Sequence, residues 1–174
     1  MMKRTIAILV AGMSVAAATN AQVCKDTSIQ QTTDPDRFVV HGDGAVTDAE
    51  TGLMWTTCSV GQSYSNGSCK GSASSMSWTQ ALQQAQIING AGGIAGQSDW
   101  RLPNIKELVS LVEFQCHSPA INLSVFPDTP SGTYWSSTPD IRDGKQARSI
   151  YFVDGSDLTP DVSSGRYIRL VRDR

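Results

Sequence analysis

Hydrophobic and polar positions recur with a helical period in two stretches near the middle of the chain. In the first, Ser77 is a helix N-cap and Gln80 follows three residues later, which is the spacing of a capping box. Asn89-Gly90 supplies a stop signal. The residues at helical spacing between them are Trp78, Ala81, Leu82, Ala85 and Ile88. The pattern predicts a helix with one apolar face.

The second helical stretch follows the segment Asp99-Trp100-Arg101-Leu102-Pro103. Asn104 can cap its first turn, and Glu107 can return a bond to the backbone of Asn104. Leu108, Leu111 and Val112 continue an apolar face at helical spacing. We therefore expect a second central helix that extends past residue 111.

Alternating and β-branched positions flank these helices on both sides. A strand is predicted at Phe38–Val40, and a hairpin over residues 46–55 turns between Asp48 and Gly52. Further strands are predicted at 133–136, 149–153 and 167–171, with a turn at Asp154-Gly155 after the second of these. Two central helices packed on short antiparallel strands make an α+β domain.

The last predicted strand has apolar residues on both of its sides, so we expect it to be internal rather than at an edge. Tyr167, Arg169 and Val171 share one side of a strand because side chains alternate. Arg169 lies between two apolar neighbours on that side. It is therefore predicted to be buried and paired with a carboxylate, either Asp99 or Glu107.

The N-terminus has the layout of a secretory signal peptide. Lys3 and Arg4 precede an apolar stretch over residues 5–18, and small residues close the segment. We predict cleavage after Ala21, with cleavage after Ala18 as the alternative. The mature chain, 22–174, is expected to be one domain with its core from about residue 31 to 174, and without a transmembrane segment.

Composition and charge narrow the function of this domain. The 174 residues include 17% charged residues and carry a net charge of −2, which excludes a highly charged disordered chain and argues against a nucleic-acid partner. From residue 22 to 140 there are five basic and eleven acidic residues, whereas from 141 to 174 there are seven basic and five acidic ones. The positive charge is therefore local.

Four cysteines in an exported chain indicate two disulfides. A flexible, polar stretch separates Cys58 from Cys69, and a local crosslink would rigidify it. Cys58–Cys69 is therefore the first predicted pair, which leaves Cys24–Cys116 as the second. A zinc site is the alternative, but no pair of cysteines has CxxC spacing and the only histidines are His41 and His117.

The basic C-terminal stretch is the candidate ligand site. Its arginines suit the oxygens of sulfate or phosphate groups, although acidic residues are interleaved among them and a mixed-charge surface is the simpler interpretation. Tyr134 and Trp135 precede this stretch and could stack on a sugar, or else pack in the core. The candidate basic residues are Arg142, Lys145, Arg148, Arg166, Arg172 and Arg174.

Other chemistry has weaker support in the sequence. Asp154, Asp157 and Asp161 are calcium candidates, but they lack EF-hand spacing and a turn at Asp-Gly explains most of the cluster. There is no Gly-x-Ser-x-Gly elbow, and Ser136 and Ser137 follow two aromatic residues in a predicted strand. We therefore predict neither a resident metal nor another cofactor, and no enzymatic activity.

Five motifs occur in order along the chain: Gly52-Leu53-Met54-Trp55, Trp78 with Ala81, the run from Asp99 to Leu108, Tyr134-Trp135-Ser136-Ser137-Thr138, and Tyr167-Ile168-Arg169-Leu170-Val171-Arg172. In this order they resemble a known family, the C-terminal domain family of the Legionella collagen-like adhesin (Lcl), long catalogued as a domain of unknown function. More distantly, the chain is similar to C-type-lectin-like and formylglycine-generating-enzyme domains.

The resemblance implies a single C-type-lectin-like domain of an exported bacterial protein. In the adhesin, such a domain recognises sulfated glycosaminoglycans as a trimer. This chain has no collagen-like Gly-X-Y tract, so trimerisation does not carry over, and its last cysteine, Cys116, lies too early for formylglycine-generating chemistry. Six residues of the shared motifs are expected to support the fold rather than to bind a ligand: Trp100, Arg101, Pro103, Asn104, Glu107 and Arg169.

Together these observations predict a non-enzymatic binding domain, exported to the periplasm or the cell surface. Its expected ligand is a glycan or another anionic surface polymer. The alternative is a structural or protein-interaction module of the cell envelope or of a surface appendage.

Overall fold

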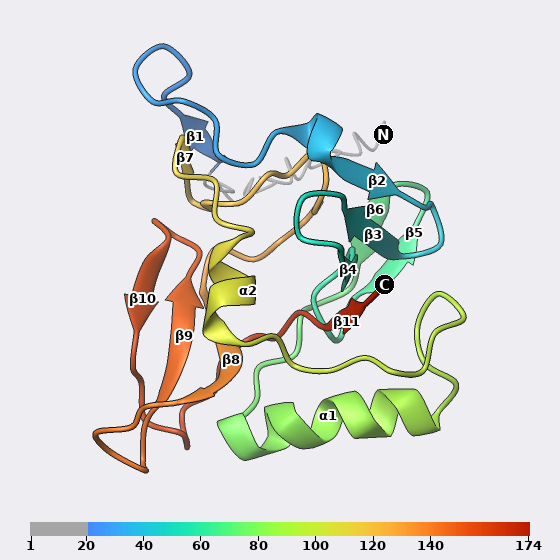
Figure 1. Ribbon diagram of the computed structural model, residues 1–174, viewed down its shortest axis with the longest axis vertical. Helices are drawn as coiled ribbons and strands as arrows, with labels where there is room; N and C mark the ends of the chain where they lie inside the picture. Colours follow the sequence, from blue (N-terminus) through green and yellow to red (C-terminus); the bar gives the residue numbers. More distant parts are fainter. Residues whose placement is uncertain (1–20) are drawn as a thin grey trace, which may run out of the picture.

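The computed structural model describes residues 21–174, and most of its regular structure is antiparallel β-sheet (Figure 1). Four small sheets are present among these residues. The predicted signal peptide, apart from its last residue Ala21, lies outside the described residues.

A four-stranded sheet contains the predicted strand and hairpin of the N-terminal half. Its strands, in the order β11-β4-β3-β2, are β2 (Phe38–Val40), β3 (Ala45–Asp48), β4 (Leu53–Thr56) and β11 (Val171–Asp173). The hairpin turn closes where the N–H of Gly52 donates to the carbonyl of Asp48 at 2.9 Å. Gly52 has a φ of +72°, which glycine adopts without a steric penalty. The predicted strand at 38–40 and the hairpin after it are confirmed.

A three-stranded sheet follows in the order β10-β9-β8. Its strands are β8 (Thr133–Pro139), β9 (Ala147–Tyr151) and β10 (Ser156–Leu158). The predicted turn at Asp154-Gly155 is present between β9 and β10, where the N–H of Gly155 donates to the carbonyl of Tyr151 at 2.8 Å. A Cβ atom on Gly155 would lie 2.5 Å from the side chain of Val112, so only glycine fits there.

Two disulfides hold the two remaining pairs of strands, and both are the pairs predicted from the sequence. Cys24–Cys116 joins β1 (Val23–Cys24) to β7 (Cys116–His117). Cys58–Cys69 closes the loop that carries the hairpin of β5 (Ser63–Ser65) and β6 (Ser68–Lys70). No described cysteine is free.

The prediction of an α+β domain with two central helices packed on strands is wrong. Only α1 (Trp78–Gly90) has several turns, and it lies along one side of the described molecule in Figure 1. α2 (Ile105–Val109) has five residues, and η1 (Pro35–Arg37) is a 3-10 helix of three. Both predicted capping boxes are nevertheless present, at Ser77 with Gln80 and at Asn104 with Glu107. The domain is therefore mostly β-sheet with one substantial helix.

The second helix ends early because Leu111 and Val112 are buried by tertiary contacts rather than by a helical face. Val112 forms a β-bridge with Ile121, and the N–H of Glu113 donates to the carbonyl of Ala120 at 3.1 Å. Burial at 108, 111 and 112 thus imitates a helical period while the backbone leaves the helix at Ser110.

The predicted final strand over 167–171 is also corrected, since Arg166 and Tyr167 form only isolated β-bridges and β11, which begins at Val171, lies at the edge of its sheet. The residues before it connect the two larger sheets. The N–H of Tyr167 donates to the carbonyl of Thr133 at 3.0 Å, and the carbonyl of Leu170 accepts from the N–H of Thr56 at 3.0 Å. An extended, buried segment can therefore pair with two sheets in turn.

Two apolar clusters form the core. Trp55, Leu108 and Phe126 belong to one, and Trp100 and Trp135 belong to the other. Trp55 and Trp100 are buried, as expected for core residues, and Trp78 packs partly buried against the second cluster.

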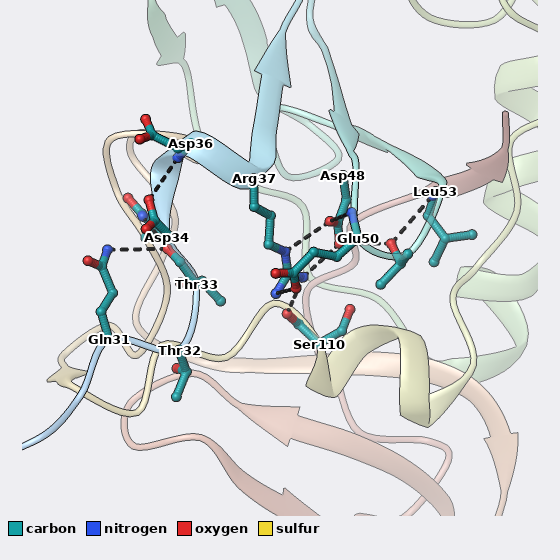
Figure 2. A network of polar contacts seen from close by, with 12 residues as sticks. Gln31, Thr32, Thr33, Asp34, Asp36, Arg37, Asp48, Glu50, Leu53 and Ser110 are labelled. Atoms are coloured by element: carbon teal, nitrogen blue, oxygen red, sulfur yellow. Dashed lines mark hydrogen bonds and ion pairs between the residues drawn. The ribbon is translucent and has the colours of Figure 1, made fainter.

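Arg37, at the end of η1 and directly before β2, bonds to the β3–β4 hairpin and to the end of α2 (Figure 2). Its guanidinium donates to both carboxylate oxygens of Asp48, at 2.9 and 2.6 Å, and to the carbonyl of Ser110 at 2.9 Å. Glu50 completes the network at 3.1 Å. The side chain of Asp48 is fully buried, so this pair links η1, the β3–β4 hairpin and the end of α2.

Candidate functional site

The Arg-Leu-Pro-Asn segment, residues 101–104, stabilises the start of α2. Arg101 donates two bonds to Glu107, both of 2.8 Å, and a third to Asp173 at 2.9 Å. Glu107 also accepts from the N–H of Asn104 at 2.7 Å. Buried Trp100 donates through its indole to the carbonyls of Ile94 and Gln97, and the carbonyl of Pro103 accepts from Ser137. These polar groups are therefore paired within the protein, although the side chain of Arg101 remains 39% exposed and lines a surface pocket.

Arg169 is fully buried, but its predicted carboxylate partner is wrong. Its guanidinium donates to the carbonyls of Thr56 and Thr57 and to the hydroxyl of Thr129, and it lies 4.7 Å from the ring centre of Phe126. Burial lowers the pKa of Arg169 to about 10, which leaves it protonated at neutral pH. The charge is therefore held by carbonyl oxygens and an aromatic face instead of a carboxylate.

Tyr134 and Trp135 do not reach the surface, so the prediction that they could stack on a sugar is corrected. Both are 0% exposed. The hydroxyl of Tyr134 bonds to that of Ser59 at 2.7 Å, and the indole of Trp135 donates to the carbonyl of Met76 at 2.9 Å. Each polar group is satisfied inside the fold, as a buried aromatic residue requires.

Arg142 and Arg148 line one cleft of about 500 Å³ at the β8–β9 loop, and each is paired with a carboxylate. Arg142 contacts Asp140 at 2.7 Å and Arg148 bonds to Asp157. The hydrogen bond from Arg142 lowers the pKa of Asp140 to about 2, so Asp140 stays ionised and competes with any anionic ligand. Lys145, on the same loop, is exposed and makes no ion pair with a described residue.

Arg172 and Arg174 lie elsewhere, at the end of the chain. Arg172 in β11 forms a two-pronged bond with Asp99, whose Oδ2 atom is 3.0 Å from Nη2. This contact raises the pKa of Arg172 and lowers that of Asp99. The structure thus divides the predicted basic stretch among separate places instead of gathering it into one patch.

Arg166 stands in a different setting from the other arginines of the stretch. It lines a pocket of about 260 Å³, and its guanidinium bonds to the carbonyl of Gly165 at 2.7 Å. Among the described residues it contacts no carboxylate within ion-pair distance, and no acidic residue lines this pocket. The polar side chains around it carry hydroxyls: Ser75, Ser131, Thr133, Tyr151 and Tyr167.

Two glycines shape this Arg166 pocket. A Cβ atom on Gly132 would lie 2.8 Å from the ring of Tyr167, and one on Gly165 would lie 2.6 Å from the hydroxyl of Ser75. Neither space can take a side chain without displacing a pocket wall. No single sequence motif marks this pocket, because its residues come from four separate segments of the chain: Ser75, residues 131–133, Tyr151 and residues 165–167.

The three calcium candidates are each used in local turns or ion pairs. Hydrogen bonds from the hydroxyls of Ser156 and Ser163, followed by those from their backbone N–H groups, lower the pKa of Asp154 and Asp161 respectively. Asp157 bonds to Arg148. Across residues 21–174, no three side chains of histidine, cysteine, aspartate or glutamate converge as a metal site would require. The turn interpretation accounts for the cluster.

Comparison with known proteins identifies the family. The Lcl C-terminal domain family matches residues 44–172, which is most of the chain. Curated protein sequences give no match. None of the helices within residues 21–174 has the length and apolar character needed to cross a membrane. Disulfides and this family fit an exported protein. The matched region contains all five motifs from Gly52 to Arg172, and the chain belongs to the Lcl C-terminal domain family.

Proposed function

We propose that this chain is a non-enzymatic, exported binding domain that recognises a glycan or another anionic surface polymer. The observation that carries the proposal is the setting of Arg166, a guanidinium without a carboxylate partner among the described residues, in a pocket lined by hydroxyls. A guanidinium fork suits carboxylate and sulfate oxygens, and hydroxyls suit the remaining oxygens of a sugar ring. The family's link to an adhesin supports the same function.

The β8–β9 loop adds a second source of positive charge. Arg142, Lys145 and Arg148 lie close together in sequence, and the cleft that contains both arginines is open to solvent. Asp140 and Asp157 offset part of this charge. We therefore assign the loop the role of attracting a polyanion, and the Arg166 pocket the role of holding one of its acidic groups.

The surroundings of Ser136 and His41 support a role without catalysis. Ser136 is buried and donates to the carbonyl of Arg148 at 2.7 Å. Nε2 of His41 lies 2.8 Å from the hydroxyl of Thr47, which is itself buried in β3. Neither pair combines an accessible nucleophile with a base.

Heparin chromatography of residues 22–174 tests the proposed function. The wild-type domain should be retained at low salt and elute as salt rises, because screening weakens contacts between exposed charges. Arg166→Ala should elute at lower salt, and the triple variant Arg142→Ala, Lys145→Ala, Arg148→Ala should lose most retention.

A matched control removes three other lysines that make no ion pair with a described residue: Lys25→Ala, Lys70→Ala and Lys106→Ala. This variant changes the net charge by the same amount as the loop variant but should keep most retention. The proposal is wrong if the wild-type domain is not retained, or if the control loses as much as the site variants. Melting curves exclude unfolding as the cause.

A protein-interaction module is the second candidate, and the edge of the four-stranded sheet favours it. Val39 and Val40 in edge strand β2 are 53% and 46% exposed. An edge strand with exposed apolar side chains can accept a strand from a partner. If the domain does not bind heparin at low salt, a protein-interaction module becomes the better-supported function.

A further inference from the structure

A second pocket lies between the loop closed by Cys58–Cys69 and the C-terminal part of α1. It has a volume of about 430 Å³, within the range of small-molecule sites. We call it the Tyr64 pocket. It shares no lining residue with the Arg166 pocket or with the cleft at the β8–β9 loop.

The wall that carries Tyr64 is fixed before any ligand arrives. The disulfide closes the loop at its base, and the side chain of Gln62 bonds to the N–H of Ser59 at 3.2 Å and to the carbonyl of Asp128 at 3.1 Å. Tyr64 also packs against Gly44, where a Cβ atom would stand 3.4 Å from the Cβ of Tyr64. A preorganised wall lowers the entropy lost on binding.

The lining combines apolar surface with a few polar groups that retain unused hydrogen-bonding capacity. Tyr64, Ile88 and Ile94 supply the apolar surface. Asp43 uses one carboxylate oxygen to accept from the N–H of Ala45 at 3.1 Å, which leaves the other available. The amide of half-buried Gln84 makes no hydrogen bond to a described residue, so it can both donate and accept.

We propose that the Tyr64 pocket binds one hexopyranose unit that carries no acidic group. A pyranose ring presents a C–H face to apolar side chains and hydroxyls to groups at its edge, which matches Tyr64 and Ile88 beside Asp43 and Gln84. Asp43 is the charged side chain of this lining, and its carboxylate repels a sugar acid.

This inference goes beyond the proposed recognition of anions and does not depend on it. The Arg166 pocket selects for negative charge, whereas the Tyr64 pocket selects against it. If the domain does not bind heparin, the inference about the Tyr64 pocket is unaffected. If no neutral sugar binds the Tyr64 pocket, the proposed binding of heparin is unaffected.

Saturation-transfer NMR on residues 22–174 tests the inference. The probes are D-glucose, D-galactose, D-mannose, N-acetyl-D-glucosamine and D-glucuronate, each in the millimolar range. High salt suppresses contributions from the basic residues. At least one neutral sugar should receive magnetisation from the protein, and D-glucuronate should receive less than D-glucose.

Two variants in α1 test whether the sugar binds in the Tyr64 pocket or elsewhere on the surface. Gln84→Ala should weaken the binding of the best neutral sugar by about tenfold, because a hydrogen bond to the ligand is lost. Gln83→Ala, the neighbouring exposed position outside the pocket lining, should bind as the wild type does. Both substitutions place alanine in α1, which the helix tolerates.

A second matched pair tests the charge. Asp43→Asn keeps the size of the side chain and should raise the binding of D-glucuronate relative to D-glucose, while Asp36→Asn, at an exposed position outside the pocket, should not. The inference is overturned if no neutral sugar binds, if Gln84→Ala binds like Gln83→Ala, or if Asp43→Asn leaves the preference unchanged.

Discussion

At the scale of single residues, two buried charges are stabilised without an ion pair. Arg169, a buried cation, donates to carbonyl and hydroxyl oxygens. Glu113, a buried anion, accepts from backbone N–H groups elsewhere in the fold. Glu113 accepts from the N–H groups of Thr33 and Gln115 at 2.8 and 2.9 Å, and from that of Thr32 at 3.1 Å. The carboxylate thus holds the N-terminal segment against the domain.

Burial of Glu113 raises its pKa, but the backbone hydrogen bonds from Gln115, Thr32 and Thr33 outweigh burial and lower it below its ordinary value of 4.5. A lowered pKa means that the ionised form stabilises the folded state above the ordinary pKa. That stabilisation is lost as the pH falls through the folded-state pKa. Acid should therefore loosen the N-terminal segment.

We expect Glu113→Gln to lower the free energy of unfolding by about 2 kcal/mol at neutral pH, because an amide N–H₂ would face backbone donors. The difference from the wild type should be constant above the ordinary pKa of 4.5 and should shrink as the pH falls below it, because the wild-type carboxylate then becomes protonated. Urea denaturation measures both. Glu50→Gln, whose parent side chain is 68% exposed, is the control and should change stability by less than about 0.5 kcal/mol. An equal effect of the two substitutions would contradict the prediction.

At the scale of elements, short-range signals placed the helix starts and the hairpin correctly, but not the lengths of the elements. Ser77 and Asn104 both accept from the residue three positions later, as predicted. The second helix stops after five residues because the chain pairs with Ile121 instead of continuing. A capping box fixes only where a helix begins.

Ser77→Ala should destabilise the domain by about 1 kcal/mol, because the N-terminal N–H groups of α1 lose their cap. The melting temperature should fall by about 2–4 °C, as expected for a domain of this size. Thermal unfolding followed by circular dichroism measures the shift. Ser72→Ala, at an exposed position outside the helix, is the control. Identical melting of the two variants would show that the cap contributes nothing.

At the scale of the whole molecule, two disulfides of very different span crosslink the chain. Cys24–Cys116 joins residues separated by 92 positions, and Cys58–Cys69 joins residues separated by 11. A longer closed loop removes more conformational entropy from the unfolded chain. The long-range disulfide should therefore contribute more stability.

Loop-closure entropy gives about 4.6 kcal/mol for the longer loop and about 2.8 kcal/mol for the shorter one. We expect Cys24→Ser with Cys116→Ser to lower the free energy of unfolding more than Cys58→Ser with Cys69→Ser. Urea denaturation of both double variants tests this order. A larger loss of stability in the Cys58 and Cys69 variant would contradict this order. It would show that the loop closed by Cys58–Cys69 stabilises the whole fold. Reduction of the wild type should lower its melting temperature more than either double variant does.

The sequence by itself determined the features that contiguous residues encode, namely the helix starts, the hairpin turn at Asp48 to Gly52 and the turn at Asp154-Gly155. It also identified the family and both disulfide pairs, because the polar loop between Cys58 and Cys69 indicated one pair and left Cys24 with Cys116 as the other. It also placed Arg169 in the interior, because alternation along an extended chain is a local property. The physical reason is that capping, turns and alternation depend on neighbours a few residues away.

Only the tertiary structure decided which side chains meet. It paired Arg172 with Asp99, gave Arg169 carbonyl partners, buried Tyr134 and Trp135, and left Arg166 in a hydroxyl-lined pocket. Segments more than a hundred residues apart make some of these contacts, as Thr56 and Arg169 do. Burial and charge pairing depend on such long-range packing, which no local pattern in the chain specifies.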